Sequence, residues 1–323
     1  MTSNHSEVMH RTKAFHDKYP LAQISSLQKH PLLNDFKNDP IHAIALRNNS
    51  SAVTPLQLEL FVAVRNLNRN MLETIEGTPG CAEIKSWNKT GPNGDAQGGG
   101  TMSTLRGKIV EKAACQMSVV WGPSYPSIEQ DHSGKPFTAM GVSFICHPYN
   151  PYGPIAHMNV RVLKVGEGAD AITWIGGGAD LTPMIPFAED TADFHNVLKK
   201  ACQDNRLGDY EKYTKWCDEY FFIPHRGETR GVGGIFFDYV KPSQDSDFQI
   251  LLDVAQGFAH TYADILARRV YTPFDDITKD KHLYWRGRYA EFNLVHDRGT
   301  RFGLMSGGNI EAIFGSLPPV VKW

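Results

Sequence analysis

The stretch GVSFICHPYNPYGPIAHMNVR, residues 141–161, contains two extended runs joined by a turn in which proline recurs at every third position. Successive residues of a strand point to opposite faces of a sheet, so alternate residues of each run share a face. One such set is polar on both runs: Ser143 and His147 on the first, and His157, Asn159 and Arg161 on the second. If the strands pair, these side chains form one polar sheet face. Such a face costs stability unless it is solvated or binds a ligand, and both explanations stay open here.

Further strand patterns surround this stretch. Runs rich in Val, Ile, Thr and Phe, punctuated by Gly and Pro, predict six strands at 81–87, 101–107, 114–121, 137–147, 156–165 and 170–176. No long helix separates them, which favours an antiparallel meander over a parallel sheet. Helical patterns follow at 187–205, 209–222, 246–270 and near 308–315, with two more strands predicted at 231–239 and 288–296. Strands grouped first and helices later indicate an α+β fold with one broad antiparallel sheet, and no linker divides it.

The first strong helix signal begins at Thr54. Thr54, Pro55 and Gln57 have the sequence of a capping box, and apolar residues then recur every three or four positions until Gly77. The preceding residues, 1–53, are polar and weakly patterned. We therefore expect a polar N-terminal arm over 1–53, disordered or loosely docked, and a single folded domain over 54–323.

The composition narrows the class of protein. The 323 residues carry 33 Lys and Arg against 35 Asp and Glu, a net charge of −2, which argues against a nucleic-acid binder. No run approaches 18 consecutive apolar residues, so we expect no integral membrane segment. The first residues resemble neither a secretory signal nor an Arg-rich, acid-poor presequence. The five cysteines are an odd number without a CxxC pair, which fits a reducing, cytoplasmic setting.

A glycine-rich segment follows the sixth strand pattern. In WIGGGADLTP, residues 174–183, three glycines precede Asp180, but the pattern completes neither a dinucleotide fingerprint nor a phosphate-binding loop. The glycines permit close approach of the backbone to a flat ligand, or an unusual turn. Asp180 is either a helix cap or a buried carboxylate directed at cationic or N–H groups. A second glycine-rich segment, 91–100, predicts a flexible hairpin loop or a mobile lid.

Charged residues gather in later segments. Arg226, Glu228 and Arg230 lie between a helix pattern and a strand pattern, and they predict either an ion-pair cluster or a clamp for carboxylate anions. Residues 297–299 have the composition of a hairpin turn. The Gly-Gly-Asn run at 307–309 is typical of a helix N-terminus, which is a ready site for an anion.

Four of the 13 histidines lie in or beside these segments: His147, His157, His195 and His225. Their number would suffice for a metal site, but no spacing between them matches a recognised metal-binding motif. His195 lies in an amphipathic helix pattern, where a hydrogen-bonded core histidine is the simpler interpretation. The four are therefore candidate metal ligands, and nothing in the pattern requires a metal.

Taken in order, the runs GVSFICHPYNPYGPIAHMNVR, WIGGGADLTP, KWCDEYFFIPHRGETRGVGGIFFD and RGRYAEFNL resemble the oxygen-dependent coproporphyrinogen III oxidases, and the similarity spans residues 55–323. The resemblance implies a large flat antiparallel sheet flanked by helices on both sides, and a homodimer formed through the C-terminal segment, about 289–323. It implies oxidative decarboxylation of two propionates of coproporphyrinogen III to vinyls, giving protoporphyrinogen IX in haem biosynthesis. Dioxygen is then the co-substrate, no organic cofactor takes part, and a divalent metal is possible but not required.

The same resemblance implies roles for individual residues. His157 would transfer protons, and Asp180 corresponds to the carboxylate that faces the pyrrole N–H groups of the macrocycle. The expected substrate contacts are Ser143, Asn159, Val160, Arg161, Gly307, Gly308 and Asn309. His147, His157, His195 and His225 fall where the family's candidate metal ligands lie. The family usually has Arg where this chain has Asn309, so one propionate contact differs here, and neighbouring arginines are candidates to compensate.

These residues suggest a mechanism. A nearly neutral protein attracts a substrate with four carboxylates through local arginines, and Arg161 is the first candidate, supported by Arg226 or Arg230. Asp180 would bind the inner N–H groups, and His157 would act as acid and base, since histidine exchanges protons near neutral pH. Two other functions stay open: a tetrapyrrole-binding protein without catalytic activity, and a histidine-ligated metal oxygenase acting on an aromatic acid.

Overall fold

A seven-stranded antiparallel sheet forms the centre of the fold in the computed structural model, which describes residues 3–46, 53–125, 134–305 and 307–323. Its strand order is β1-β2-β3-β4-β5-β6-β9, so six of the seven strands follow chain order as a meander, as predicted. The strands are β1 (Glu83–Thr90), β2 (Ala96–Leu105), β3 (Val110–Gly122), β4 (Phe137–Pro148), β5 (Ile155–Val165), β6 (Ile172–Thr182) and β9 (Gly234–Val240). A separate two-stranded ribbon pairs β7 (Phe222–Ile223) with β8 (Glu228–Thr229).

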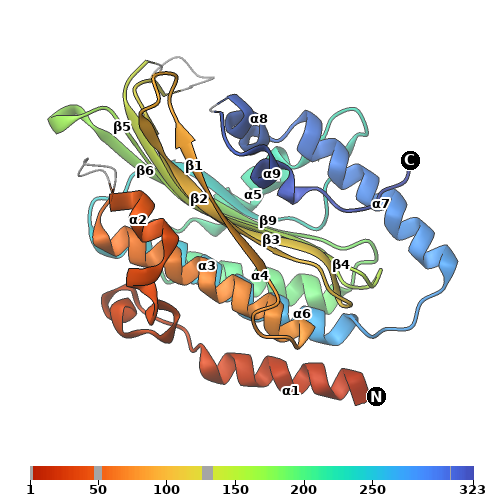
Figure 1. The fold of residues 1–323 in the computed structure, drawn as a ribbon. Helices are drawn as coiled ribbons and strands as arrows, with labels where there is room; N and C mark the ends of the chain where they lie inside the picture. The colour runs from red at the N-terminus through yellow and green to blue at the C-terminus, as the bar shows by residue number, and fades with distance from the viewer. Residues whose placement is uncertain (1–2, 47–52, 126–133, 306) are drawn as a thin grey trace.

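Helices cover both faces of the sheet (Figure 1). One face is covered by α2 (Pro40–Leu46), α3 (Pro55–Glu76), α4 (Ala188–Gln203) and α6 (Gln249–Arg269), with α1 (Ser3–Lys18) packed on α3 and α6. The other carries α7 (Asp276–Val295), α8 (Arg298–Met305) and α9 (Ile310–Ile313), while α5 (Tyr210–Tyr220) packs on β9. Short 3-10 helices span Ile24–Lys29, Pro31–Leu33, Phe36–Asn38, Gly168–Asp170, Asp245–Phe248 and Phe314–Ser316. The predicted α+β fold, an antiparallel sheet flanked by helices in one domain, is confirmed.

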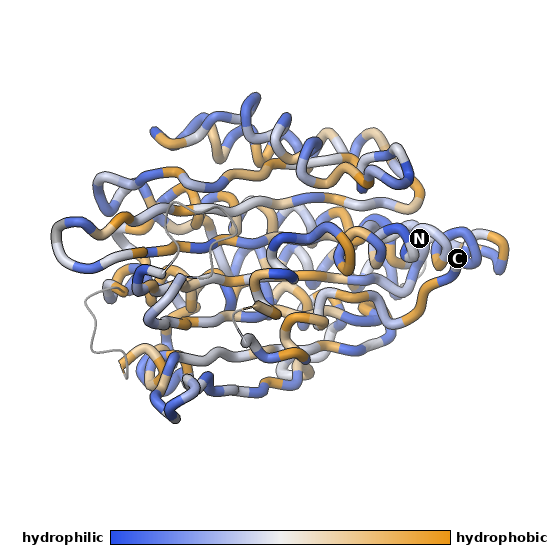
Figure 2. Tube along the Cα trace, turned by 90° about the horizontal axis from the view of Figure 1, so that it is seen from above, coloured by the Kyte–Doolittle hydropathy of each residue, from blue (hydrophilic) through white to orange (hydrophobic). Residues whose placement is uncertain are grey.

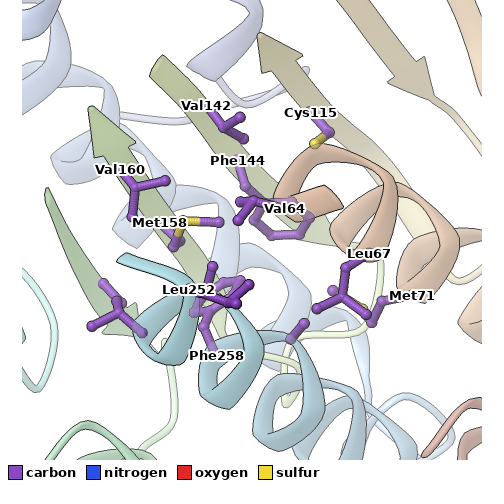
Figure 3. Close-up of a cluster of buried hydrophobic side chains, with 14 of the residues drawn as sticks. Val64, Leu67, Met71, Cys115, Val142, Phe144, Met158, Val160, Leu252 and Phe258 are labelled. Atoms are coloured by element: carbon purple, nitrogen blue, oxygen red, sulfur yellow. The ribbon is translucent and has the colours of Figure 1, made fainter. Parts of the chain in front are cut away.

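The main core lies between the sheet and α3 and α6 (Figure 3). Alternate residues of β4 and β5 enter it, among them Val142, Phe144, Met158 and Val160, all at most 1% exposed. They pack with Val64, Leu67 and Met71, which recur at three- and four-residue spacing on α3, and with Leu252 and Phe258 of α6. Burying each large apolar side chain contributes about 1.5–3 kcal/mol, so this face is the main source of stability.

The intervening residues of the same strands form the opposite, polar face. The register pairs Ser143 with Asn159, and His157 with both Ile145 and Asp180. Hydrophobic and hydrophilic residues follow one another along the extended segments, as expected for a sheet with one apolar and one polar face (Figure 2). The polar row predicted from 141–161 is therefore confirmed as a feature of the sheet.

The N-terminal segment is folded over its described range. In place of the disordered or loosely docked arm that its composition suggested, residues 3–46 form helices whose Val8, Phe15 and Ile41 side chains are at most 2% exposed. These three residues belong to the main core, so the apolar faces of α1 and α2 outweigh the polar composition of the segment. Residues 1–2 and 47–52 of the expected arm lie outside the described range. A domain boundary at residue 53 stays a prediction.

The helix predicted from Thr54 is confirmed with both of its caps. Gln57 N donates to Thr54 Oγ1 at 3.2 Å and Thr54 N donates to Gln57 Oε1 at 3.1 Å, while Gly77 ends the helix at φ 79°. Within the described part of the chain, no helix is long and apolar enough to cross a bilayer.

Two predictions near the C-terminus are wrong. Residues 288–296, predicted as a strand, belong mainly to α7, because its buried face is partly polar and hides the helical period: His282, Arg286, Tyr289 and Asn293 lie on it. Residues 297–299 do not form a hairpin turn. Asp297 Oδ2 accepts a hydrogen bond from Thr300 N at 2.7 Å, and this places it at the start of α8.

The glycine-rich segments also differ from expectation. Residues 91–95 do join β1 and β2 as a hairpin, but residues 96–100 already belong to β2. The three glycines at 176–178 lie inside β6 rather than in a loop, and Asp180 is a strand residue rather than a helix cap. A lid over the site at 91–100 stays untested.

Candidate active site

A cavity of about 640 Å³ lies against the polar sheet face. Its sheet side includes four residues of the predicted polar row: Ser143, His157, Asn159 and Arg161. Its other walls come from the end of α5, from the residue after β8, from β9 and from α7 to α9, through Tyr220, Arg230, Asp238, Asn293, Arg298, Arg301, Gly308 and Asn309. The meander therefore forms the floor of the cavity, and segments about 60 to 150 residues beyond Arg161 form its roof.

The most buried charged group of the site is Asp180, which is 1% exposed and lies behind the cavity lining. Its Oδ2 accepts a hydrogen bond from Arg230 Nη2 at 2.8 Å, and its Oδ1 lies 3.1 Å from His157 Nδ1. Burial alone would raise the pKa of Asp180, but the Arg230 guanidinium and His157 lower it below its ordinary value. Asp180 is therefore ionised and assigns the hydrogen of His157 to Nδ1, so Nε2 is left for a ligand.

Three aromatic rings surround the Arg230 guanidinium, and both of its Nη atoms donate hydrogen bonds. Its guanidinium lies 4.0 Å from the centre of the Phe221 ring, 4.4 Å from Tyr289 and 4.8 Å from Phe292. Its Nη1 donates to Asn293 Oδ1 at 3.0 Å. Burial would lower the pKa of Arg230, but the nearby Asp180 raises it, so the buried pair remains charged.

A second ion pair stands beside the first. Arg161 Nη2 donates to Asp238 Oδ2 at 2.8 Å and Nη1 donates to Asn159 Oδ1 at 2.5 Å. Burial would lower the pKa of Arg161, whereas Asp238 raises it, so the guanidinium stays charged. Gly176 leaves the room for this pair, since a Cβ there would lie 2.6 Å from Asp238 Oδ1 and 2.9 Å from Arg161 Nε.

The remaining predicted substrate contacts divide into two groups. Ser143 is exposed to the cavity, and Gly308 and Asn309 line it. The Val160 side chain instead enters the main core and is 0% exposed, so only its backbone faces the cavity. Gly307 is not part of the lining. Asn309 Oδ1 accepts a hydrogen bond from Ala312 N at 3.0 Å and so caps α9, as the Gly-Gly-Asn run predicted.

The four candidate metal ligands lie in four different environments. His147 Nε2 is 2.9 Å from Ser316 O, and burial and Arg286 lower its pKa well below the ordinary value. His195 lies between Tyr210 Oη (2.8 Å) and Val232 O (2.9 Å), as a hydrogen-bonded core histidine. His225 contacts Glu291 at 2.9 Å, and His157 contacts Asp180.

These histidines do not form one ligand set in this structure. Across residues 3–46, 53–125, 134–305 and 307–323, no three His, Cys, Asp or Glu side chains are grouped so as to hold a metal ion. Use of a divalent metal, which the resemblance makes possible but does not require, is not tested by this observation. His147 has another role, because it acts with Lys112 (2.6 Å to Leu317 O) and Gln116 (2.5 Å to Ala312 O) to fasten the α9 region over β3 and β4.

The charged cluster at 226–230 is confirmed as a set of ion pairs, and its role as a clamp for a carboxylate stays a prediction. Arg226 and Glu228 are ion-paired outside the cavity, with Glu291 (2.6 Å) and Arg288 (3.0 Å), whereas Arg230 lines the cavity. Sequence reasoning missed Asp238, Asn293 and Tyr220. A carboxylate inside the apolar run FFDYV was an available signal for Asp238, but nothing in the local pattern distinguishes the other two.

The sequence was also compared with known protein families. A sequence model described as coproporphyrinogen III oxidase matches residues 59–323, a range that includes every strand of the sheet and every residue that lines the cavity. The match confirms the resemblance drawn from the sequence runs, and with it an oxidoreductase that performs oxidative decarboxylation in haem biosynthesis. The chain therefore belongs to the coproporphyrinogen III oxidase family.

Proposed function

We propose that this enzyme uses dioxygen to decarboxylate two propionates of coproporphyrinogen III, with the macrocycle bound in the cavity against the polar sheet face. The observation that carries the proposal is the combination found there: a histidine held by a buried, ionised aspartate, next to two fixed arginines. A reduced tetrapyrrole with four carboxylates needs proton transfer and anion binding within one cavity, and this site offers both.

The floor of the cavity suits a flat ligand. Where β3 and β4 face the cavity, most positions carry small side chains: Ala114, Ser118, Ala139, Gly141 and Ser143. The glycines at 176–178 were the expected place for close approach, but the Arg161–Asp238 pair fills the space beside Gly176. The small residues of β3 and β4 therefore replace them as the surface on which a pyrrole ring can lie.

The chemistry requires no organic cofactor for its balance. In each half-reaction a propionic acid side chain and O₂ give a vinyl group, CO₂ and H₂O₂, so O₂ accepts the two electrons and two protons that the side chain loses. His157 Nε2 would move a proton at the reacting ring, and Arg161 would hold a propionate carboxylate. Asp180 is behind the lining, so its proposed role is to hold His157 and Arg230 rather than to touch the pyrrole N–H groups.

Two features support the expected assembly and location. Large apolar side chains are exposed on α7, α8 and α9, namely Leu294 (52%), Val295 (58%), Leu304 (46%), Met305 (59%) and Ile310 (60%). Clustered exposed side chains of this kind are typical of protein interfaces, and they support a homodimer through about 289–323. All five cysteines are free thiols, which supports a cytoplasmic enzyme.

The test is incubation of the purified protein with coproporphyrinogen III in air and under nitrogen, followed by chemical oxidation and chromatography of the fluorescent porphyrins. We expect protoporphyrin only in air, with about one H₂O₂ per CO₂. Binding of the macrocycle without product would instead identify a tetrapyrrole-binding protein. Activity that disappears on chelation and returns with one metal ion per chain would favour a metal oxygenase.

A further inference from the structure

We propose that Arg301, on α8, binds a carboxylate that the reaction leaves on the macrocycle, and so determines how the substrate is oriented. This inference rests on the proposed function. Arg301 belongs neither to the polar row nor to the charged cluster at 226–230, and it differs from the other arginines around the cavity.

Four arginines line the cavity: Arg161, Arg230, Arg298 and Arg301. The first two each have a carboxylate 2.8 Å away, Asp238 and Asp180, which cancels most of their charge. For the two on α8, no described residue places a carboxylate oxygen within ion-pair distance. The cavity charge that no described carboxylate offsets is therefore at α8, and it is available to a substrate carboxylate other than the one that Arg161 would hold.

The two α8 arginines are not equivalent. Arg298 directly follows Asp297, and its guanidinium lies 5.9 Å from the centre of the Tyr220 ring, whose hydroxyl donates to Asp297 at 2.8 Å. Arg301, three residues later, has no such ring or carboxylate partner in the described part of the structure. It is exposed and lines the cavity, so its planar fork is open to a bidentate carboxylate contact.

The position of Arg301 points to a carboxylate far from the reacting one. Its neighbour Phe302 packs with Tyr125, and both join the small cluster of Leu163 and Trp174 at one end of β5 and β6. Leu163 is six residues from His157 on β5, a separation of about 20 Å. The macrocycle carries carboxylates around its whole rim. When the reacting propionate lies at His157, other carboxylates of the same molecule therefore lie toward the Leu163 end of β5.

The experiment compares Arg301→Gln and Arg301→Lys with the wild type in steady-state turnover. We expect Arg301→Gln to raise KM at least tenfold with kcat within threefold, and Arg301→Lys to recover most of the KM. Lys200→Gln is the matched control, since it removes an exposed cation on α4, across the sheet, and should leave both constants unchanged. A variant with unchanged KM, or with kcat lowered at constant KM, would overturn the assignment.

Equilibrium binding separates a retained carboxylate from a reacting one and does not depend on turnover. Fluorescence titrations use coproporphyrin, with four carboxylates, and protoporphyrin, which keeps only the two that the reaction leaves. We expect Arg301→Gln to weaken both at least fivefold relative to Lys200→Gln. Weaker binding of coproporphyrin alone would show that Arg301 contacts a reacting propionate and would refute the proposal. Failure of the proposed function would appear separately, as a wild type that forms no product in air.

Discussion

Ser143 and Phe144 are neighbours in the chain, yet they serve opposite faces of the sheet. Phe144 is 0% exposed and packs edge-on against Phe258 of α6 at 5.2 Å, whereas Ser143 opens into the cavity. The same alternation continues on β5, where Met158 and Val160 enter the core and His157 and Asn159 face the site. One face of the sheet thus contributes to the core and the other to the site, although both belong to the same hydrogen-bonded strands.

Stability and chemistry can therefore be changed almost separately in this protein. Apolar residues under α3 and α6 supply the free energy that holds the strands rigid. The polar face can then carry buried ions, which contribute little net stability because their desolvation offsets their attraction.

The largest effect should follow from emptying the core face. Phe144→Ala removes a fully buried ring and should lower the free energy of unfolding by about 3–5 kcal/mol. Ser143→Ala, one residue away, should change it by less than about 0.5 kcal/mol and act on KM instead. Denaturant titration of both variants, with turnover measured well below the melting temperature, checks the contrast. Equal losses of stability would abolish the distinction between the faces.

The next effect concerns Asp180, the group at which we expect the separation between stability and chemistry to fail. Asp180→Asn leaves Arg230 buried without its counter-charge, and we expect kcat/KM to fall about 100-fold, about 3 kcal/mol of transition-state stabilisation. Arg161→Ala should lower it by a similar factor. Stopped assays with the folded variants measure this, with Asp204→Asn on the exposed end of α4 as control. Near-wild-type turnover in either variant would remove that residue from the mechanism.

An intermediate loss of stability is expected at low pH, because of two histidines on the α1 side of the molecule. His16 and His260 bring their Nδ1 atoms within 2.6 Å, next to Asp264 and the Phe15 ring, and burial together with His16 lowers the pKa of His260 to about 4. In the unfolded state His260 binds a proton below about pH 6.5, whereas in the folded state it stays unprotonated until about pH 4.

Stability should therefore fall as the pH drops from about 6.5 to about 4, and His260 should account for about 2 kcal/mol of that loss. His260→Gln should flatten this part of the profile in urea titrations at several pH values. His282, whose pKa burial and Arg286 lower to about 2, contributes in the same direction and remains as an internal reference. A variant profile parallel to that of the wild type would disprove the role of His260.

The smallest effect probes the polar face through a single methyl group. Gly176→Ala places a Cβ against the Arg161–Asp238 pair, and we expect kcat/KM to fall about tenfold, about 1.4 kcal/mol. Asp238→Asn should give a loss of similar size through the same ion pair. If Gly176→Ala alone were inactive, the glycine would serve the substrate directly and not the arginine.

The fold could be predicted where periodicity and burial agree. The strands β3 to β6 and the helix α3 follow from alternation and from apolar spacing, and the polar row of 141–161 follows from the same alternation. The helix α7 could not, since Arg286 occupies its core face, held by Glu111 at 2.7 Å and Pro148 O at 2.7 Å. A buried charge satisfied by distant partners erases the apolar period.

The residues of the site could be predicted one by one, but which of them form pairs could not. His157, Asp180 and Arg161 stood out in the sequence, whereas the partnership of Asp180 with Arg230 spans 50 residues and depends on how β9 returns to β6. Likewise, the four histidines looked alike as potential ligands. Only their neighbours, such as Ser316 for His147 and Tyr210 for His195, distinguish them.

The roof of the cavity has a consequence for how the protein is made. The sheet order is largely sequential, so its strands can pair as they leave the ribosome, and α6 completes the core by residue 269. The helices α7, α8 and α9, with Arg298, Arg301 and Asn309, are synthesised after that. A nascent chain thus acquires its scaffold before the proposed cavity is complete, and a reactive porphyrinogen meets that cavity only after the segment that contains α7 to α9 has been synthesised.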